Sequence, residues 1–143
     1  HTYTLVSGTG DADNASFSVS GSSLLSAAVF DYEVKSSYSI RVRTTDAGGQ
    51  MYEEIFTITI NNANETPTNI LLSNNTIDES LSAGTTVGTF SSTDPDAGDT
   101  FTYTLVSGAG SIDNGSFTIT GNTLQSNAVF NFEVKSTYSI RVR

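Results

Sequence analysis

Apolar and polar residues alternate along most of the chain. The clearest alternating runs are Thr2–Val6, Ser16–Ser20, Tyr38–Val42 and Phe56–Ile60. Successive side chains of a strand point to opposite faces, so a period of two with β-branched and aromatic residues indicates half-buried strands. No segment keeps the 3.6-residue period of a helix. The pattern therefore predicts an all-β chain.

The same alternation predicts which side chains of the first part of the chain are buried. Each of them lies on the apolar face of a run, and its polar neighbours are expected to face solvent. The predicted core residues are Phe17, Val19, Leu24, Tyr38, Ile40, Val42, Phe56, Ile58 and Ile60.

The chain contains an internal repeat. His1–Arg43 and Phe101–Arg143 align without a gap at an offset of 100 residues, and 28 of the 43 positions are identical. A period of this length is the size of one small domain. About seven short strands per period, with turn signals every ~8–12 residues, predict an immunoglobulin-like β-sandwich.

The boundary between the two copies is expected in the polar segment Asn61–Pro67. Pro67 lacks an amide donor and favours extended backbone at Thr66. Residues 1–65 are then the back part of one repeat, and residues 66–143 are the front part of the next, without its last strand. Because incomplete sandwiches expose sheet edges, we expect this chain not to be a stable isolated monomer: either its ends continue, or another copy donates a strand.

Charge and composition exclude several classes of function. The chain has 15 acidic and 6 basic residues and a net charge of −9, which argues against binding nucleic acid or an anionic membrane. It has no cysteine and a single histidine, so thiolate catalysis, zinc–thiolate sites and a Ser-His-Asp triad are excluded. No apolar run approaches the ~18 residues of a membrane span. We expect a protein that is not an enzyme and does not insert into membranes.

The acidic residues gather in the loops between the alternating runs. They are Asp31, Glu33, Asp46, Glu65, Glu79, Asp94, Asp96 and Asp99. Carboxylates beside Asn and Gly are typical ligands of a hard cation, and Ca²⁺ takes 6–8 oxygen ligands in proteins. Asp, Asn and Gly are also ordinary turn residues that bond their own backbone. At this point both interpretations stand.

Five segments together resemble the bacterial cadherin-like repeat, which is close in plan to the extracellular domains of animal cadherins. Their order and spacing match that family along the whole chain. They are Phe30–Glu33 (FDYE), Val42–Gly49 (VRTTDAGG), Ile60–Thr68 (INNANETPT), Ile77–Thr89 (IDESLSAGTTVGT) and Ser92–Asp99 (STDPDAGD). The resemblance implies a cadherin-type β-sandwich with Ca²⁺ bound at each junction between repeats.

The resemblance also implies which residues hold the ion. The junction within this chain would use Asp31 and Glu33 from the first repeat, Asn62, Asn64 and Glu65 from the linker, and Asp94 and Asp96 from the second repeat. By the same mapping, Glu79 and Asp46 belong to the neighbouring junctions, and Glu133 keeps the place of Glu33. Asn131 replaces Asp31 in the second copy, and Asn62 stands where the family has Asp. Each such change removes a charge and lowers cation affinity, in a class of site with Kd of ~10⁻⁴–10⁻³ M.

The function implied by the resemblance is structural. We expect a non-enzymatic, extracellular adhesion or spacer module within a long bacterial surface, matrix or filament protein. Its partners would be neighbouring repeats or other copies, or a cell-surface protein or polysaccharide. Two alternatives remain at this stage: an accessory module of a secreted polysaccharide-degrading enzyme, and a filament subunit that shares strands between copies.

Overall fold

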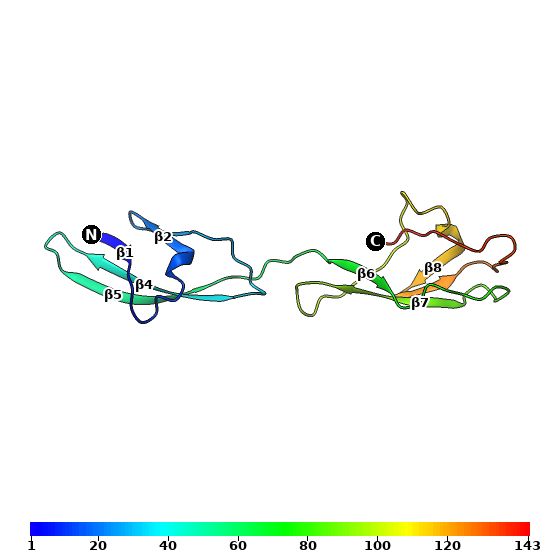
Figure 1. Ribbon diagram of the computed structural model, residues 1–143, viewed down its shortest axis with the longest axis horizontal. Helices are drawn as coiled ribbons and strands as arrows, with labels where there is room; N and C mark the ends of the chain where they lie inside the picture. The colour runs from blue at the N-terminus through cyan, green and yellow to red at the C-terminus, as the bar shows by residue number, and fades with distance from the viewer. The chain divides into compact units, whose positions relative to one another are not determined.

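The computed structural model describes residues 1–143, which form two compact units, His1–Asn64 and Glu65–Arg143 (Figure 1). We call them the first and the second unit. Nearly all regular structure is β-strand. The exceptions are two single turns of 3₁₀-helix at equivalent repeat positions, η1 (Asn14–Ser16) and η2 (Asn114–Ser116). The expectation of an all-β chain is confirmed.

The first unit contains a sheet and a separate hairpin. The sheet has the order β1-β4-β5 and consists of β1 (Thr2–Leu5), β4 (Ser37–Thr45) and β5 (Met51–Thr59). The hairpin joins β2 (Phe17–Ser20) to β3 (Ser23–Ser26). The four alternating runs fall on β1, β2, β4 and β5, so the period-two pattern located the strands of this unit.

The second unit contains a four-stranded antiparallel sheet. Its order is β6-β7-β9-β8, from β6 (Asn69–Leu72), β7 (Thr86–Thr93), β8 (Phe117–Thr120) and β9 (Thr123–Ser126). Opposite this sheet, the extended segment near Leu105 pairs with the one near Val142 through a single antiparallel bridge. Backbone hydrogen bonds of 2.9 Å run in both directions between Thr104 and Arg143 beside that bridge.

The core of the second unit lies between these two layers. Its buried side chains come from β7, β8, β9 and the extended segments: Val87, Phe90, Tyr103, Phe117, Leu124 and Phe130. An aromatic cluster recurs in both units. Phe17, Phe30 and Tyr38 have ring centroids 4.8–6.0 Å apart. Phe117, Phe130 and Tyr138 repeat this at 4.6–5.9 Å.

The predicted core of the first unit is only partly buried. Phe17 and Ile40 are buried, but Leu24 is 40% exposed and Phe56 is 47% exposed, so for these two residues the prediction was wrong. The other six predicted residues are half-buried, namely Val19, Tyr38, Val42, Ile58 and Ile60 together with the ring of Phe30 that packs on them.

The second copy of the repeat shows the physical reason. Leu124, the equivalent of Leu24, is 2% exposed because β7 pairs with β9 and covers that side of the hairpin. In the first unit β3 pairs only with β2. The alternation therefore identified the apolar face correctly, while the strand that would cover it is not part of this unit.

Candidate metal centre

The loop that follows β7 is anchored to the chain that enters β6. Asn69 pairs with Thr93 at the end of the β6–β7 ladder. One residue earlier, the Thr68 N–H donates to the Thr93 carbonyl at 2.8 Å, and the two Thr hydroxyls lie 2.9 Å apart. These contacts fix the start of the loop Asp94–Asp99, and Gly98, at a φ of 96°, provides its turn.

Three carboxylates converge in this loop. Asp94, Asp96 and Asp99 each offer a carboxylate oxygen, and these oxygens lie within 4.8 Å of one another. Asp96 is 8% exposed, Asp94 is half-buried, and Asp99 is exposed. Like charges this close disfavour one another's ionised forms unless a positive charge lies among them. The loop is therefore a place where a bound cation would lower the free energy.

The buried oxygen of Asp94 has no hydrogen-bond donor. The Asp94 Oδ1 atom accepts a 3.0 Å hydrogen bond from the Asp96 N–H, but Oδ2 is buried without a partner. A buried carboxylate oxygen without a donor or a cation is costly, and native structures rarely leave one so. This atom is the observation in the structure that points most directly to a missing positive ligand.

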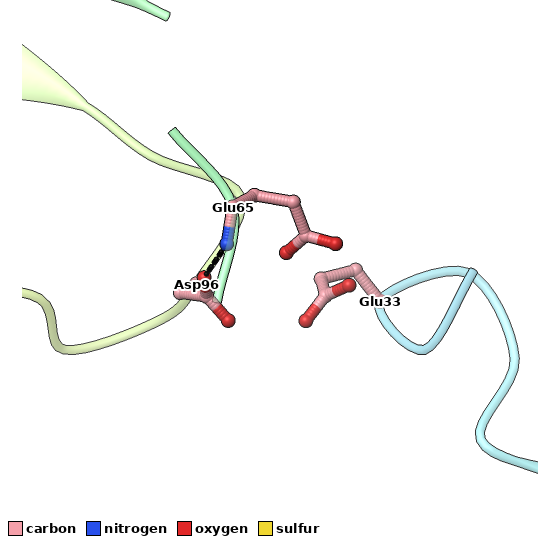
Figure 2. Close-up of side chains that lie close together, drawn as sticks. All are labelled: Glu33, Glu65 and Asp96. Atoms are coloured by element: carbon pink, nitrogen blue, oxygen red, sulfur yellow. Dashed lines mark hydrogen bonds between the residues drawn. The ribbon is translucent and has the colours of Figure 1, made fainter. Parts of the chain in front are cut away.

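The first residue of the second unit orients Asp96. The backbone N–H of Glu65 donates to Asp96 Oδ2 at 2.8 Å (Figure 2). One oxygen of the buried carboxylate is thus held by the linker segment of the same unit. The Glu65 side chain itself is exposed. The resemblance had grouped Glu65, Asp94 and Asp96, and the structure brings the backbone of Glu65 into contact with this acidic loop.

Glu79 lies beside another loop of the second unit. Its Oε2 atom accepts a 3.0 Å hydrogen bond from the Phe132 N–H, and the Ser80 N–H donates to the Phe130 carbonyl at 2.9 Å. The turn that Glu79 contacts carries Asn131 and the exposed Glu133. Glu79 and Glu133 thus belong to one region of this unit, but no third acid joins them.

Asp31 and Glu33 occupy the equivalent turn of the first unit. Asp31 Oδ1 accepts from the Val34 N–H at 2.9 Å, and Asn131 Oδ1 accepts from the Val134 N–H at 3.1 Å in the other copy. The replacement of Asp31 by Asn131 therefore preserves a turn. Glu33 is exposed and extends from this turn.

Asp46 stabilises the hairpin between β4 and β5. Its Oδ1 atom accepts a 2.8 Å hydrogen bond from the Gln50 N–H, and its carbonyl accepts from the Gly49 N–H at 3.1 Å. These contacts give Asp46 a turn role within the first unit. The remaining predicted ligands, Asn62 and Asn64, are exposed and lie in the irregular segment that follows β5.

Sequence reasoning left two features out of its candidate set. Asp99 completes the acidic loop, and its position three residues after Asp96 was a usable signal. The second feature is a pair of repeated ion pairs, Lys35–Asp13 and Lys135–Asp113. The hydrogen bond from Lys35, followed by that from the Ser39 N–H, holds the pKa of Asp13 below its usual value. Spacing could not have paired residues 22 positions apart.

The donor set of the acidic loop fits a hard cation. It consists of oxygen atoms, and Ca²⁺ and Mg²⁺ prefer carboxylate and carbonyl oxygens, whereas zinc and copper sites use nitrogen or sulfur. Several carboxylates on a short, partly irregular loop suit the flexible coordination of Ca²⁺ better than the strict octahedron of Mg²⁺. The orphaned Asp94 Oδ2 atom fits the same ion.

Comparison with known proteins identifies the fold. No protein-family model matches the chain, and no curated protein matches it. Among solved structures, extracellular domains 1–2 of human protocadherin-24 superpose with a TM-score of 0.70 at 17% identity, over 99% of this chain and 68% of that chain. The fold is cadherin-like.

Two further structures agree with the cadherin-like fold. Extracellular domains 3–6 of protocadherin gamma B2 match 99% of the chain with a TM-score of 0.64 and 16% identity. Domains 1–4 of protocadherin gamma B7 match 98% with a TM-score of 0.62 and 22% identity. The chain spans 34% and 35% of the length of these two structures. The immunoglobulin-like β-sandwich expected from the sequence is confirmed.

The helical content of the cadherin-like units adds one finding on membranes. The two helices are single turns, and neither has the length or the apolar character needed to cross a bilayer.

Proposed function

We propose that the chain is a non-enzymatic extracellular module whose acidic loop binds Ca²⁺ and stiffens the junction between consecutive cadherin-like domains. The observation that carries this proposal is the convergence of Asp94, Asp96 and Asp99 around a buried Asp94 oxygen that has no hydrogen-bond partner. The cadherin-like fold and the net charge of −9 support the same interpretation. Ca²⁺ would neutralise the clustered carboxylates and hold the loop against the linker.

The second unit contributes the part of the proposed site that the structure describes. Asp94, Asp96 and Asp99 supply carboxylate oxygens, and Glu65 supplies a side chain from the linker. From the family resemblance we assign the remaining ligands to residues that precede this unit: Asp31, Glu33, Asn62 and Asn64. An ion that binds residues on both sides of a short polar linker would restrict its motion, which is otherwise the default for tandem domains.

We assign the remaining predicted ligands to neighbouring junctions. Glu79 and Glu133, which share one region of the second unit, would serve the junction at that end, and Asp46 would serve the one next to the first unit. Asn131 makes the first of these sites less charged than its counterpart with Asp31. We expect weaker binding there, because removing a carboxylate lowers the affinity for Ca²⁺.

The proposal also gives the chain its place in a longer array. Residues 1–65 would be the back part of one cadherin-like repeat and residues 66–143 the front part of the next, in a bacterial surface, matrix or filament protein. The 100-residue internal period supports tandem repetition. Neighbouring repeats or other copies would then be the principal partners, and adhesion to a surface protein or polysaccharide would be a property of the whole array.

Thermal unfolding with and without Ca²⁺ tests the proposal. At a Ca²⁺ concentration of ~10 Kd, binding stabilises the folded state by ~1.4 kcal/mol. For a unit of this size that corresponds to a rise in Tm of roughly 5–10 °C. The double variant Asp94→Asn, Asp99→Asn should lose this rise. The control Glu54→Gln also removes a carboxylate, from an exposed position on β5, and should keep it.

The comparison of the three proteins decides the matter. A rise in Tm that is reversed by a chelator in the wild type and in Glu54→Gln, and that is absent in the double variant, supports the acidic loop as the site. An unchanged Tm at millimolar Ca²⁺ in the wild type, or an equal rise in all three proteins, contradicts it.

A further inference from the structure

We propose that the edge of the second unit formed by Thr137–Arg143 is a binding site for an added antiparallel strand with the sequence pattern of β5. We call this segment the open edge. The inference does not depend on Ca²⁺ and concerns a different part of the second unit from the acidic loop. It follows from comparing the two copies of one sequence, of which only the first is paired on both sides.

The backbone of the open edge is hydrogen-bonded on one side only. The Asp113 N–H donates to the Ser139 carbonyl at 3.0 Å, the Val106 N–H donates to the Arg141 carbonyl at 2.9 Å, and Arg143 exchanges bonds with Thr104. Alternate residues of a strand direct their N–H and C=O groups to opposite sides. The backbone groups of the residues between them therefore point to the other side, where no strand pairs with them. These residues are Tyr138, Ile140 and Val142.

The first unit shows what pairs with this sequence. Ser37–Thr45 forms β4, whose residues up to Arg43 differ from the open edge only in having Ser37 in place of Thr137. β5 runs antiparallel to β4 along its whole length, with Tyr38 opposite Ile58 and Ile40 opposite Phe56. The same sequence thus has a known partner strand with a known register.

The charged face of the open edge lacks the carboxylate that its first copy has. In the first unit, Glu53 of β5 accepts a 2.7 Å hydrogen bond from Arg41 Nε and a 2.5 Å bond from Arg43 Nη2. The hydrogen bonds from Arg43 and then Arg41 hold the pKa of Glu53 below its usual value. Arg141 and Arg143 form no ion pair and instead line an open cavity of about 600 Å³.

The apolar face of the open edge borders a second cavity. Its volume is about 800 Å³, and Leu72, Phe117, Phe132, Tyr138 and Ile140 are among the residues that line it. A strand in the β5 register would place the counterparts of Ile58 and Phe56 opposite Tyr138 and Ile140, on the face that borders this cavity. Apolar side chains that leave water there would add a hydrophobic gain to the backbone hydrogen bonds.

These three observations define the chemistry of the occupant. It is an extended segment that alternates large apolar residues with polar ones and carries a carboxylate at the position of Glu53. The carboxylate is specified by charge complementarity with Arg141 and Arg143, and the apolar side chains are specified by the cavity. Met51–Ile60 has this pattern, so a copy of that segment presented by another polypeptide is the partner that the open edge fits.

Amide hydrogen exchange on the full 143-residue chain tests the proposal. The probe is a synthetic peptide with the sequence of residues 48–62. On its addition, the amides of Tyr138, Ile140 and Val142 should exchange at least ten times more slowly. The amides of Tyr38, Ile40 and Val42, which β5 already covers, are the internal control and should not change. A peptide with Phe56→Asp and Ile58→Asp should protect none of them.

A charge exchange tests the register. The chain variant Arg141→Glu, Arg143→Glu should bind the probe peptide about tenfold more weakly, and a peptide with Glu53→Arg should restore binding to that variant. The milder variant Arg141→Gln, Arg143→Gln should show an intermediate loss, and protection of the β9 amides reports that either variant is folded. Unchanged exchange at the open edge, protection along β2 and β3 instead, or a failure of the exchanged charges to restore binding would overturn the proposal.

Discussion

Asp13 and Asp94 are carboxylates of the same residue type, but their surroundings assign them different roles. Asp13 is fully supplied with donors, because Lys35 bonds Oδ1 and the Ser39 N–H bonds Oδ2 at 2.7 Å. Asp113 repeats this arrangement with Lys135 and Ser139. Asp94 has a buried oxygen that no donor reaches. At the scale of single residues, the satisfied carboxylates hold the fold, and the unsatisfied one is the candidate ligand.

The satisfied carboxylates predict how stability depends on pH. The pKa values of Asp13, Asp113 and Glu53 are lowered in the folded protein, in each case mainly by a hydrogen bond from a cationic side chain. Below the ordinary Asp value of 3.8, the unfolded chain binds protons before the folded one does, so stability falls as the pH drops further. Above that value, the contribution of both Asp residues is fully present.

The double variant Asp13→Asn, Asp113→Asn isolates this effect. It should be less stable than the wild type at neutral pH, and its free energy of unfolding should decline less between about pH 4 and pH 2. Urea unfolding at a series of pH values measures both quantities. Parallel curves for the two proteins would show that these ion pairs do not control acid stability.

The motif resemblance located the acidic loop but could not separate ligands from turn formers. Asp31 and Asp46 were candidates for the same reason as Asp94, since all three stand in Asp/Asn/Gly-rich loops. In the structure, Asp31 and Asp46 accept backbone hydrogen bonds within their turns, as Asp residues in turns commonly do. Only the three-dimensional course of each loop shows which oxygen atoms remain for a cation.

At the scale of elements, one hairpin sequence occurs in two environments. β2–β3 and β8–β9 have the same pairing register, and Phe17 and Phe117 are buried to the same extent, 8% exposed. Their second strands differ, because β9 also pairs with β7 and β3 has no such neighbour. The alternation in the sequence predicted the strand and its apolar face. It could not predict burial, which depends on a strand from a distant part of the chain.

A matched pair of substitutions measures the effect of that neighbour. Leu124→Ala should lower the free energy of unfolding by ~2–5 kcal/mol, because Leu124 is fully packed and a cavity would remain. Leu24→Ala at the equivalent position should cost no more than about 1 kcal/mol, because that side chain already contacts solvent. Native-state hydrogen exchange gives the stability of each unit separately. Equal losses at the two sites would contradict the difference in burial.

At the scale of the whole molecule, the sequence repeats every 100 residues, whereas the two units contain different strands of the repeat. The all-β class and the sandwich architecture could be predicted from period-two patterning and turn spacing. The sheet order β6-β7-β9-β8 could not, because it pairs strands that are more than 30 residues apart and depends on how the two layers close. The same long-range closure brings Asp94, Asp96 and the Glu65 N–H together.

The central claim is that the loop Asp94–Asp99 is a Ca²⁺ site, and a residue-resolved NMR titration of the full chain tests it most directly. The account predicts saturable shifts at millimolar Ca²⁺, largest at the amides of Asp94, Asp96, Asp99 and Glu65, with an apparent Kd of ~10⁻⁴–10⁻³ M. The Asp94→Asn, Asp99→Asn variant should lose them. Shifts that do not saturate, or that spread evenly over all exposed acids while this loop stays unchanged, would contradict the account.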